Sequence, residues 1–88
     1  MSARPPRIEF PCEYPIAVVG EAAVDFRAMV ETIVERHAPG FPRERTTVRE
    51  SGGGRWVSVR LTIRATGEAQ LAALFAELKG TGRVQTVL

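Results

Sequence analysis

The sequence predicts an α+β domain, a four-stranded antiparallel sheet with two helices on one face. Three observations lead to this prediction: an alternating strand over residues 55–65, two amphipathic helical segments, and a βαββαβ order of elements. The strand's apolar side chains point one way: Val57, Val59, Leu61, Ile63 and Ala65. Its other side chains point the opposite way: Trp56, Ser58, Arg60, Thr62 and Arg64. This alternation is typical of an antiparallel sheet covered on one side only.

Length and composition indicate one small globular domain. The chain has 88 residues, of which 44% are hydrophobic and 25% charged, which are ordinary globular values. The formal charge of +2 is too small to establish a nucleic-acid binder. We expect residues 1–9 to be a flexible tail and residues 10–88 to form the domain.

Several classes of protein are disfavoured. A single cysteine, Cys12, cannot close an internal disulfide, and no Cys/His spacing resembles a zinc site. The N-terminus lacks the apolar stretch of a signal peptide, and no run of 18 apolar residues occurs. We therefore expect a cytoplasmic protein with no membrane partner and no cofactor.

The first half of the chain predicts a strand followed by a helix. In the strand, over residues 14–20, Tyr14, Ile16 and Val18 would be buried, and Gly20 would mark a tight turn or a close backbone approach. Over residues 22–37 apolar side chains recur at three- and four-residue steps, which predicts an amphipathic helix.

The second half of the chain predicts two strands, a helix and a last strand. Residues 45–50 suit a charged edge strand, and the glycine-rich link 51–54 predicts a hairpin to the strand over 55–65. Thr66 is a candidate N-cap for a helix, and Gly80 a candidate C′ residue in left-handed conformation. That helix carries an apolar stripe of Leu71, Leu74, Phe75 and Leu78. A last strand covers residues 82–88.

Two split β-α-β units with right-handed crossovers give a ferredoxin-like plait of strand order 4-1-3-2. Since side chains alternate between the two faces along each strand, five arginines are expected on the uncovered face: Arg45, Arg49, Arg60, Arg64 and Arg83. No acidic residue shares this face, and on the last strand we expect Val87 to point out and Leu88 to point in. We select four residues of this face for partner contact: Arg49, Trp56, Arg60 and Arg64.

This face has three interpretations: a solvated surface, a protein interface (a homodimer or an acidic partner), and a site for single-stranded nucleic acid. Arg and Trp favour an interface. Nucleic acid is disfavoured, because RNA-recognition sheets need aromatic residues on both central strands and only Trp56 has the right parity.

No enzyme site emerges. His37 ends the apolar stripe of the first predicted helix, and a packing or capping role there accounts for its presence. Cys12 has no histidine near it in sequence that could activate it as a nucleophile. The link 51–54 joins two strands and no lysine follows it, unlike a phosphate loop. A small anionic ligand could bind the strand-to-helix turn at Gly20 and Glu21 through free helix amides.

The motifs resemble the YbeD-like family of small bacterial proteins. The residues that carry this resemblance are Phe10-Pro11, the strand end at Gly20, His37-Ala38-Pro39-Gly40, the run 58–66, and Val87-Leu88. The resemblance implies a ferredoxin-like fold akin to regulatory ACT domains, and a role in lipoate metabolism that has been proposed for the family.

We therefore expect a non-enzymatic regulatory or adaptor domain that binds a protein partner or a small metabolite. The alternative is weak binding of nucleic acid or other anions by the same arginine-bearing face.

Overall fold

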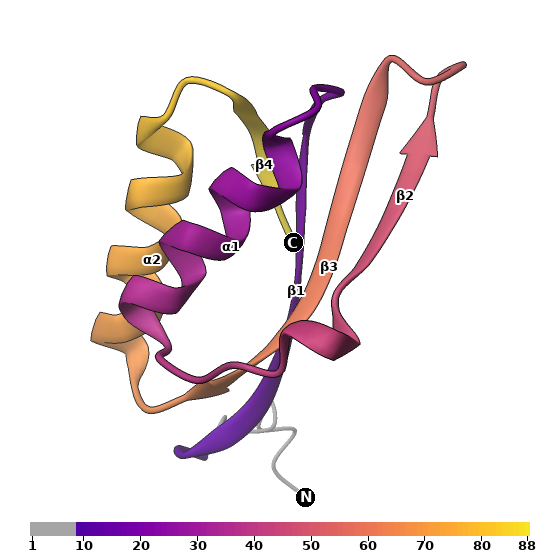
Figure 1. Ribbon diagram of the computed structural model, residues 1–88. Helices are drawn as coiled ribbons and strands as arrows, with labels where there is room; N and C mark the ends of the chain where they lie inside the picture. Colours follow the sequence, from indigo (N-terminus) through magenta and orange to yellow (C-terminus); the bar gives the residue numbers. More distant parts are fainter. Residues whose placement is uncertain (1–8) are drawn as a thin grey trace, which may run out of the picture.

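A four-stranded antiparallel sheet carries two helices on one face, as the computed structural model shows (Figure 1). The structure describes residues 9–88, so the tail expected over residues 1–9 lies outside it except for Glu9. The strands are β1 (Cys12–Glu21), β2 (Thr47–Ser51), β3 (Trp56–Ala65) and β4 (Val84–Val87). The helices are α1 (Phe26–His37), α2 (Glu68–Gly80) and a short 3-10 turn, η1 (Arg43–Arg45).

The strand order is β2-β3-β1-β4, which is the predicted order 4-1-3-2 read from the other edge. The ferredoxin-like plait is therefore confirmed. β1 and β3 form the centre of the sheet and pair over ten residues, from Cys12 opposite Ala65 to Glu21 opposite Trp56.

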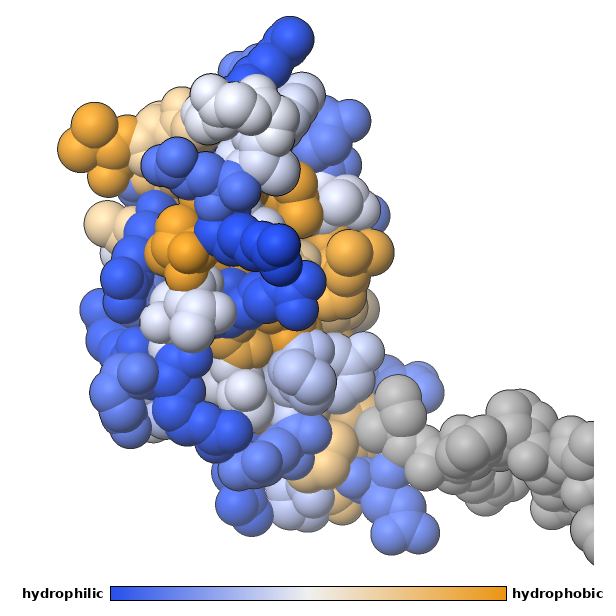
Figure 2. Space-filling view, turned by 90° about the vertical axis from the view of Figure 1, so that its right-hand side faces the viewer, coloured by the Kyte–Doolittle hydropathy of each residue, from blue (hydrophilic) through white to orange (hydrophobic). Residues whose placement is uncertain are grey.

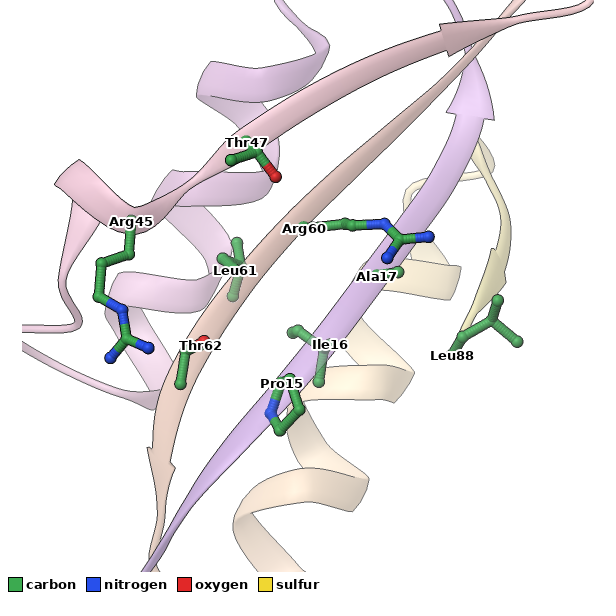
Figure 3. A pocket seen from close by; sticks show the side chains of 9 residues that line it. All are labelled: Pro15, Ile16, Ala17, Arg45, Thr47, Arg60, Leu61, Thr62 and Leu88. Atoms are coloured by element: carbon green, nitrogen blue, oxygen red, sulfur yellow. The ribbon is translucent and has the colours of Figure 1, made fainter.

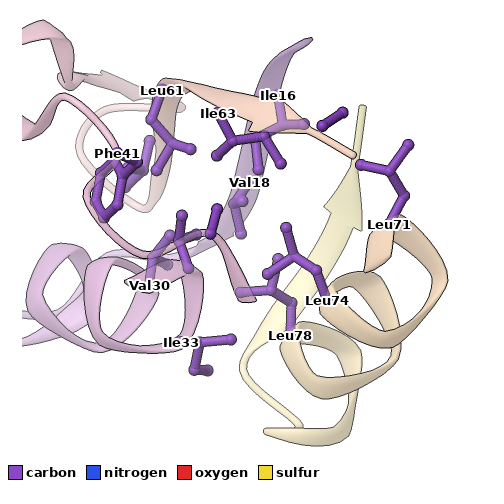
Figure 4. Packing of buried hydrophobic residues seen from close by; sticks show 14 of the residues in the cluster. Ile16, Val18, Val30, Ile33, Phe41, Leu61, Ile63, Leu71, Leu74 and Leu78 are labelled. Atoms are coloured by element: carbon purple, nitrogen blue, oxygen red, sulfur yellow. The ribbon is translucent and has the colours of Figure 1, made fainter. Parts of the chain in front are cut away.

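The core lies between the sheet and the two helices (Figure 4). The alternation predicted for β3 is confirmed, since its five apolar side chains are all buried and its other side chains are half-buried or exposed. α1 contributes Phe26, Val30, Ile33 and Val34, and α2 contributes Leu71, Leu74 and Leu78. Complete burial of one such side chain is worth about 1.5–3 kcal/mol, so this layer supplies most of the stabilisation.

The sequence placed the start of α1 four residues too early. The helix begins at Phe26 because the amide of Ala22 still belongs to the sheet, where it donates to the carbonyl of Arg55 at 2.9 Å. The chain then turns through residues 23–25 before the helical hydrogen bonds begin.

Both ends of α2 also differ from the prediction. At the start, Gly67 occupies the N-cap position, and the side-chain oxygen of Gln70 accepts the amide of Thr66 at 2.8 Å. At the end, Gly80 is the last helical residue, and the left-handed conformation occurs at Gly82, with φ of 74°. The helix start is therefore capped by Gln70 in the first turn, whose side chain accepts the backbone amide of Thr66, and not by the Thr66 side chain.

A β-bulge between β1 and β4 reverses the predicted orientation of the chain end. Val18 lies opposite Val87, but Gly20 lies opposite Val84, so β4 contains one extra residue. Val87 therefore packs against the core, and Leu88, which exchanges two backbone hydrogen bonds with Ala17, lies on the open side of the sheet. The prediction that Val87 points out and Leu88 in was wrong, because strict alternation does not hold across a bulge.

The end of β1 holds α1 and β4 close together. A Cβ atom on Gly20 would lie 2.3 Å from the carbonyl oxygen of Arg83 and 2.6 Å from the ring of Phe26, so only glycine fits. The close backbone approach expected at Gly20 is confirmed. Asp25, just before α1, accepts two hydrogen bonds from the Arg83 guanidinium, at 2.7 and 3.0 Å.

Gly20→Ala should destabilise the protein. We expect the free energy of unfolding to fall by about 1–3 kcal/mol, because the added methyl group must displace backbone and a buried ring. Denaturant unfolding followed by circular dichroism measures this. Gly80→Ala is the matched control, since nothing lies within 4 Å of its Cβ position and it ends a helix. Equal stability of the two variants would contradict the prediction.

The Arg83 guanidinium, through its hydrogen bonds and its charge, holds the pKa of Asp25 below its usual value of 3.8. Since the folded-state pKa is the lower one, this pair stabilises the fold above pH 3.8, and the contribution is lost as the pH falls through the folded-state value. Arg83→Gln should raise the Asp25 pKa, which carboxyl NMR titration measures, with Arg64→Gln as the control. An unchanged Asp25 pKa in Arg83→Gln would contradict this assignment.

Candidate functional site

The side of the sheet away from the helices is the candidate site, and we call it the open face (Figure 2). Strand pairing places these residues on it: Glu13, Pro15, Ala17, Val19, Glu21, Thr47, Arg49, Ser51, Trp56, Ser58, Arg60, Thr62, Arg64, Thr86 and Leu88. In Figure 2 strongly hydrophilic groups cross this side of the molecule, with hydrophobic patches between them. The open face thus combines charge with apolar surface.

The structure brings together three of the four residues predicted for partner contact. Arg49 lies opposite Ser58 on the neighbouring strand, so it is diagonal to both Trp56 and Arg60. Diagonal neighbours on one face are about 7–8 Å apart, within reach of long side chains. Arg64 lies four residues beyond Arg60, about 13 Å along the strand, and so stands apart from this group.

The charge distribution differs from the prediction in two respects. Glu13 and Glu21 share the open face, since they lie opposite Arg64 and Trp56, so the expectation of no acidic residue there was wrong. It failed because β1 extends to both glutamates, beyond the predicted strand 14–20. Arg83 does not join the arginines of the open face, because Asp25 holds it at the start of α1.

Three arginines of the open face nevertheless have no acidic partner. Arg49, Arg60 and Arg64 form no ion pair with any residue of the described range 9–88, whereas Arg45 lies 3.4 Å from Glu13. Several acids on the helical side are paired locally: Glu31 with Arg27, Glu77 with Arg36 and His37, and Glu35 with Arg43. The open face therefore keeps a net positive charge.

A shallow hollow of about 310 Å³ lies in the open face (Figure 3). Apolar groups of Pro15, Ala17 and Leu88 line it together with Thr47 and Thr62. Arg45 stands at one side, and the Arg60 side chain extends from β3 across β1 toward Ala17 (Figure 3). In Figure 3 the Arg60 guanidinium lies beside Ala17, between Arg45 and Leu88, so the hollow combines apolar groups with two guanidinium groups.

The hairpin between β2 and β3 partly covers Trp56. The Arg55 guanidinium lies 5.5 Å from the centre of its ring, and a Cβ atom on Gly52 would lie 2.9 Å from the indole. The ring is half-buried as a result. Less of its surface is available for stacking on a base or a partner than the sequence suggested.

The turn after β1 lines a second hollow, of about 350 Å³, with Glu21, Trp56 and Arg83 among its walls. Gly20 is buried, is not among the residues that line this hollow, and serves the packing of Phe26 and β4. Asp25 already places a carboxylate at the start of α1, which makes this helix end less favourable for an anion. The small ligand predicted at Gly20 and Glu21 stays a prediction.

The two candidate nucleophile or base residues lie in structural positions. Cys12 is half-buried opposite Ala65 and packs against the core, and His37 Nε2 lies 2.6 Å from the Glu77 carboxylate on α2. In the part of the chain described, no three His, Cys, Asp or Glu residues come close enough to hold a metal ion. Over the same residues, neither helix has the length and apolar character needed to cross a membrane.

The hollow includes residues that sequence reasoning did not select. The alternation of side chains along the first strand already indicated that Ala17 points outward, and the same alternation would have identified Pro15. Leu88 could not be found in this way, because the bulge in β4 reverses its orientation. Arg45 was placed on this face, but its position at the rim depends on η1, which the sequence did not indicate.

Solved structures with this fold support the architecture. Protein HP0495 from H. pylori superimposes with a TM-score of 0.72 over 98% of this chain and 90% of that one, at 15% identity. The ACT domain from GTP pyrophosphokinase of Chlorobium tepidum gives a TM-score of 0.64 over 86% and 84% of the two chains, also at 15% identity. The fold is therefore ferredoxin-like and similar to that of ACT domains.

Sequence relatives agree with the resemblance drawn from the motifs, which is confirmed. A UPF0250 protein of Pseudomonas paraeruginosa is 49% identical over 86 residues, covering 97% of this chain and 92% of that protein. The model of the family described as "Protein of unknown function (DUF493)" matches residues 5–88, and the chain belongs to that family.

Proposed function

We propose that this protein is a non-enzymatic regulatory or adaptor domain whose open face binds an acidic protein partner. The observation that carries the proposal is that Arg49, Arg60 and Arg64 share the open face and form no ion pair within residues 9–88, with Arg60 beside an apolar hollow. An uncompensated positive face attracts anionic surfaces more strongly than the formal charge of +2 implies.

The extent of the charged surface favours a macromolecule over a small metabolite. Trp56 and Arg64 lie eight residues apart on β3, which corresponds to about 26 Å measured along the strand. Arg and Trp side chains are enriched where binding energy concentrates in protein interfaces. A metabolite would occupy only one end of this surface, and the turn at Glu21 is then the alternative place for it.

A regulatory role also agrees with the fold, since one structural neighbour is a domain of GTP pyrophosphokinase. Fold similarity raises the expectation of a role without assigning it. The connection to lipoate metabolism rests on the family resemblance alone, and it belongs to the proposal as the process that such a domain would regulate.

The alternative proposal, weak binding of nucleic acid, uses the same arginines as phosphate contacts. Two features of the open face work against it. Glu13 and Glu21 would repel phosphates, and the hairpin covers part of the single aromatic ring available for stacking.

Reversing two charges on the open face should abolish partner binding. The variant Arg60→Glu/Arg64→Glu places carboxylates where the partner's own acids would lie, and both side chains are exposed, so the fold should persist. Affinity capture from a lysate of Pseudomonas paraeruginosa, which has a relative 49% identical to this chain, followed by quantitative mass spectrometry, measures the loss.

The matched control is Arg27→Glu/Lys79→Glu, which changes the net charge equally but on the helical side. We expect this control to recover the same proteins as the unmodified chain. Recovery that is equal for the open-face variant and the unmodified chain would exclude the open face as the interface.

For the alternative, a labelled single-stranded oligonucleotide should bind only weakly, with an affinity that falls steeply with salt. Fluorescence anisotropy between 50 and 200 mM salt measures this, because each neutralised phosphate adds about 0.7 to the slope of log K against log salt. Micromolar or tighter binding at 200 mM salt, lost in Arg60→Glu/Arg64→Glu, would favour nucleic acid over a protein partner.

A further inference from the structure

We infer that an extended acidic segment of the partner adds a strand to the sheet along residues 12–16 of β1, in line with β4. The backbone of this segment pairs with Glu13 and Pro15, and a glutamate side chain of the segment reaches Arg60 on the open face. This inference rests on the proposed function and names how the chain of the partner is bound.

The first half of β1 has a neighbouring strand on one side only. β3 pairs with β1 along its whole length. On the other side β4 pairs with β1 only from Ala17 to Gly20, and Ala17 exchanges two backbone hydrogen bonds with Leu88, at 2.8 and 3.0 Å. Within residues 9–88 nothing pairs with residues 12–16 on that side. In Figure 3 β4 ends at Leu88 and β1 continues past it, so the sheet has an open edge there.

Backbone groups at this edge point away from the sheet. In an antiparallel pair, alternate residues direct both of their backbone groups toward the same neighbouring strand. Those of Ala17 go to Leu88, and β1 pairs with β3 without irregularity. The amide and carbonyl of Glu13 and the carbonyl of Pro15 therefore point the same way as those of Ala17, whereas proline has no N–H to offer. An extended segment satisfies these groups, since it adds to a sheet through its own backbone.

The other edges of the sheet suit an acidic segment less well. Beside residues 61–65 of β3, η1 lies close to the strand, and the Gln70 side chain donates to the carbonyl of Arg64 at 3.3 Å. β2 has an unpaired outer edge as well. The Arg60 side chain, however, extends from β3 across β1 and away from β2 (Figure 3). The charge and the apolar surface of the hollow thus favour the β1 side.

A glutamate opposite Pro15 has the right position to meet Arg60. Residues opposite each other in paired strands share a face, so this residue lies on the open face with Pro15. It is the diagonal neighbour of Ala17, beside which the Arg60 guanidinium lies (Figure 3). Diagonal neighbours are about 7–8 Å apart, within reach of a long side chain. Its methylene groups would also cover Leu88, which is 76% exposed.

The neighbouring positions define the rest of the segment. The residues before and after the glutamate lie opposite Ile16 and Tyr14 on the helical side, where Ile16 is buried and Tyr14 packs against the core, so they should be apolar. The next residue lies opposite Glu13 and should not be acidic, because like charges directly opposite each other are destabilising. An antiparallel segment, the more stable arrangement, therefore reads apolar, Glu, apolar, and then a neutral or basic residue.

A second copy of the chain fits this edge less well than a segment of another protein. Both strands would then lack the N–H of Pro15, so fewer backbone hydrogen bonds could form than with a segment free of proline. The position opposite Ala17 is also already occupied by Leu88. Proline and charge at a sheet edge are features that discourage pairing between identical chains.

Peptide selection tests the inference. A random linear-peptide display library is selected against the unmodified chain, and the enriched peptides are synthesised. Fluorescence anisotropy measures their affinity for the unmodified chain, for Arg60→Glu, and for the matched control Arg27→Glu on the exposed side of α1. We expect the pattern given above, binding about tenfold weaker or worse in Arg60→Glu because attraction becomes repulsion, and unchanged binding in the control. Circular dichroism verifies that each variant is folded.

Hydrogen exchange followed by NMR identifies the edge that is used. The amide of Val48 on β2 is the counterpart of the Glu13 amide, since Val59 opposite it directs its backbone groups toward β1. Both amides should exchange quickly in the free chain. The bound peptide should slow the exchange of Glu13 and leave that of Val48 unchanged.

Methylation of successive peptide nitrogens tests the extended conformation without altering the protein. In a strand, alternate N–H groups face the same neighbour. The affinity should therefore fall several-fold or more at every second nitrogen and change little at those between.

Five results overturn the inference. Slowed exchange at Val48 instead of Glu13 would place the peptide on β2. Methylation effects without alternation would exclude a strand, and a library that enriches no peptide would exclude an extended segment. A dimer in sedimentation, with the Glu13 amide already protected in the chain alone, would assign the edge to a second copy. After any of these, lysate capture with Arg60→Glu/Arg64→Glu still decides the proposed function independently. Peptides that bind the unmodified chain and Arg60→Glu equally would exclude the acidic contact and count against the proposed function as well.

Discussion

β1 and β3 pair antiparallel over ten residues, and the rest of the structure depends on this pairing. It aligns two alternating sequences. The five buried side chains of β3, from Val57 to Ala65, face the helices, and the remaining five, from Trp56 to Arg64, lie on the open face. A slip of one residue would expose Val59 and Leu61 and bury Arg60 and Arg64. Burial of unpaired charge is far too costly for that register to compete.

The same pairing brings the functional groups together. Because strands on either side of β3 are held in one register, Arg49 from β2 and Ala17 from β1 become neighbours of Arg60, although they are far apart in the chain. The open face is thus a product of pairing rather than of any local motif. Its apolar centre arises because β1 contributes small or ring-closed side chains there, with Pro15 opposite Thr62 and Ala17 opposite Arg60.

The two sides of the molecule differ in how their charges are paired. Acids on the helical side have basic partners nearby, whereas three arginines of the open face have no acidic partner within residues 9–88. Acids of the helical side pair with arginines four residues away or across the two helices, as Glu31 and Glu77 do. On the open face Glu13 and Glu21 are the only acids that strand pairing places beside these arginines, and neither forms an ion pair with Arg49, Arg60 or Arg64 within residues 9–88. An almost neutral chain can therefore keep an unpaired positive surface, and this is the physical basis for expecting an acidic partner.

Periodicity in the sequence determined the element order and the buried face of β3, because alternation and helical spacing are local properties. The strand order followed from the handedness of the crossovers, and the close approach at Gly20 from the lack of a side chain there. Tertiary structure alone decided the later start of α1, the orientation of Leu88, the withdrawal of Arg83 to Asp25 and the hollow beside Arg60. Each of these depends on a hydrogen bond or a bulge between segments distant in sequence. Such contacts leave no periodic signal in either segment, so they become visible only when the strands are in register.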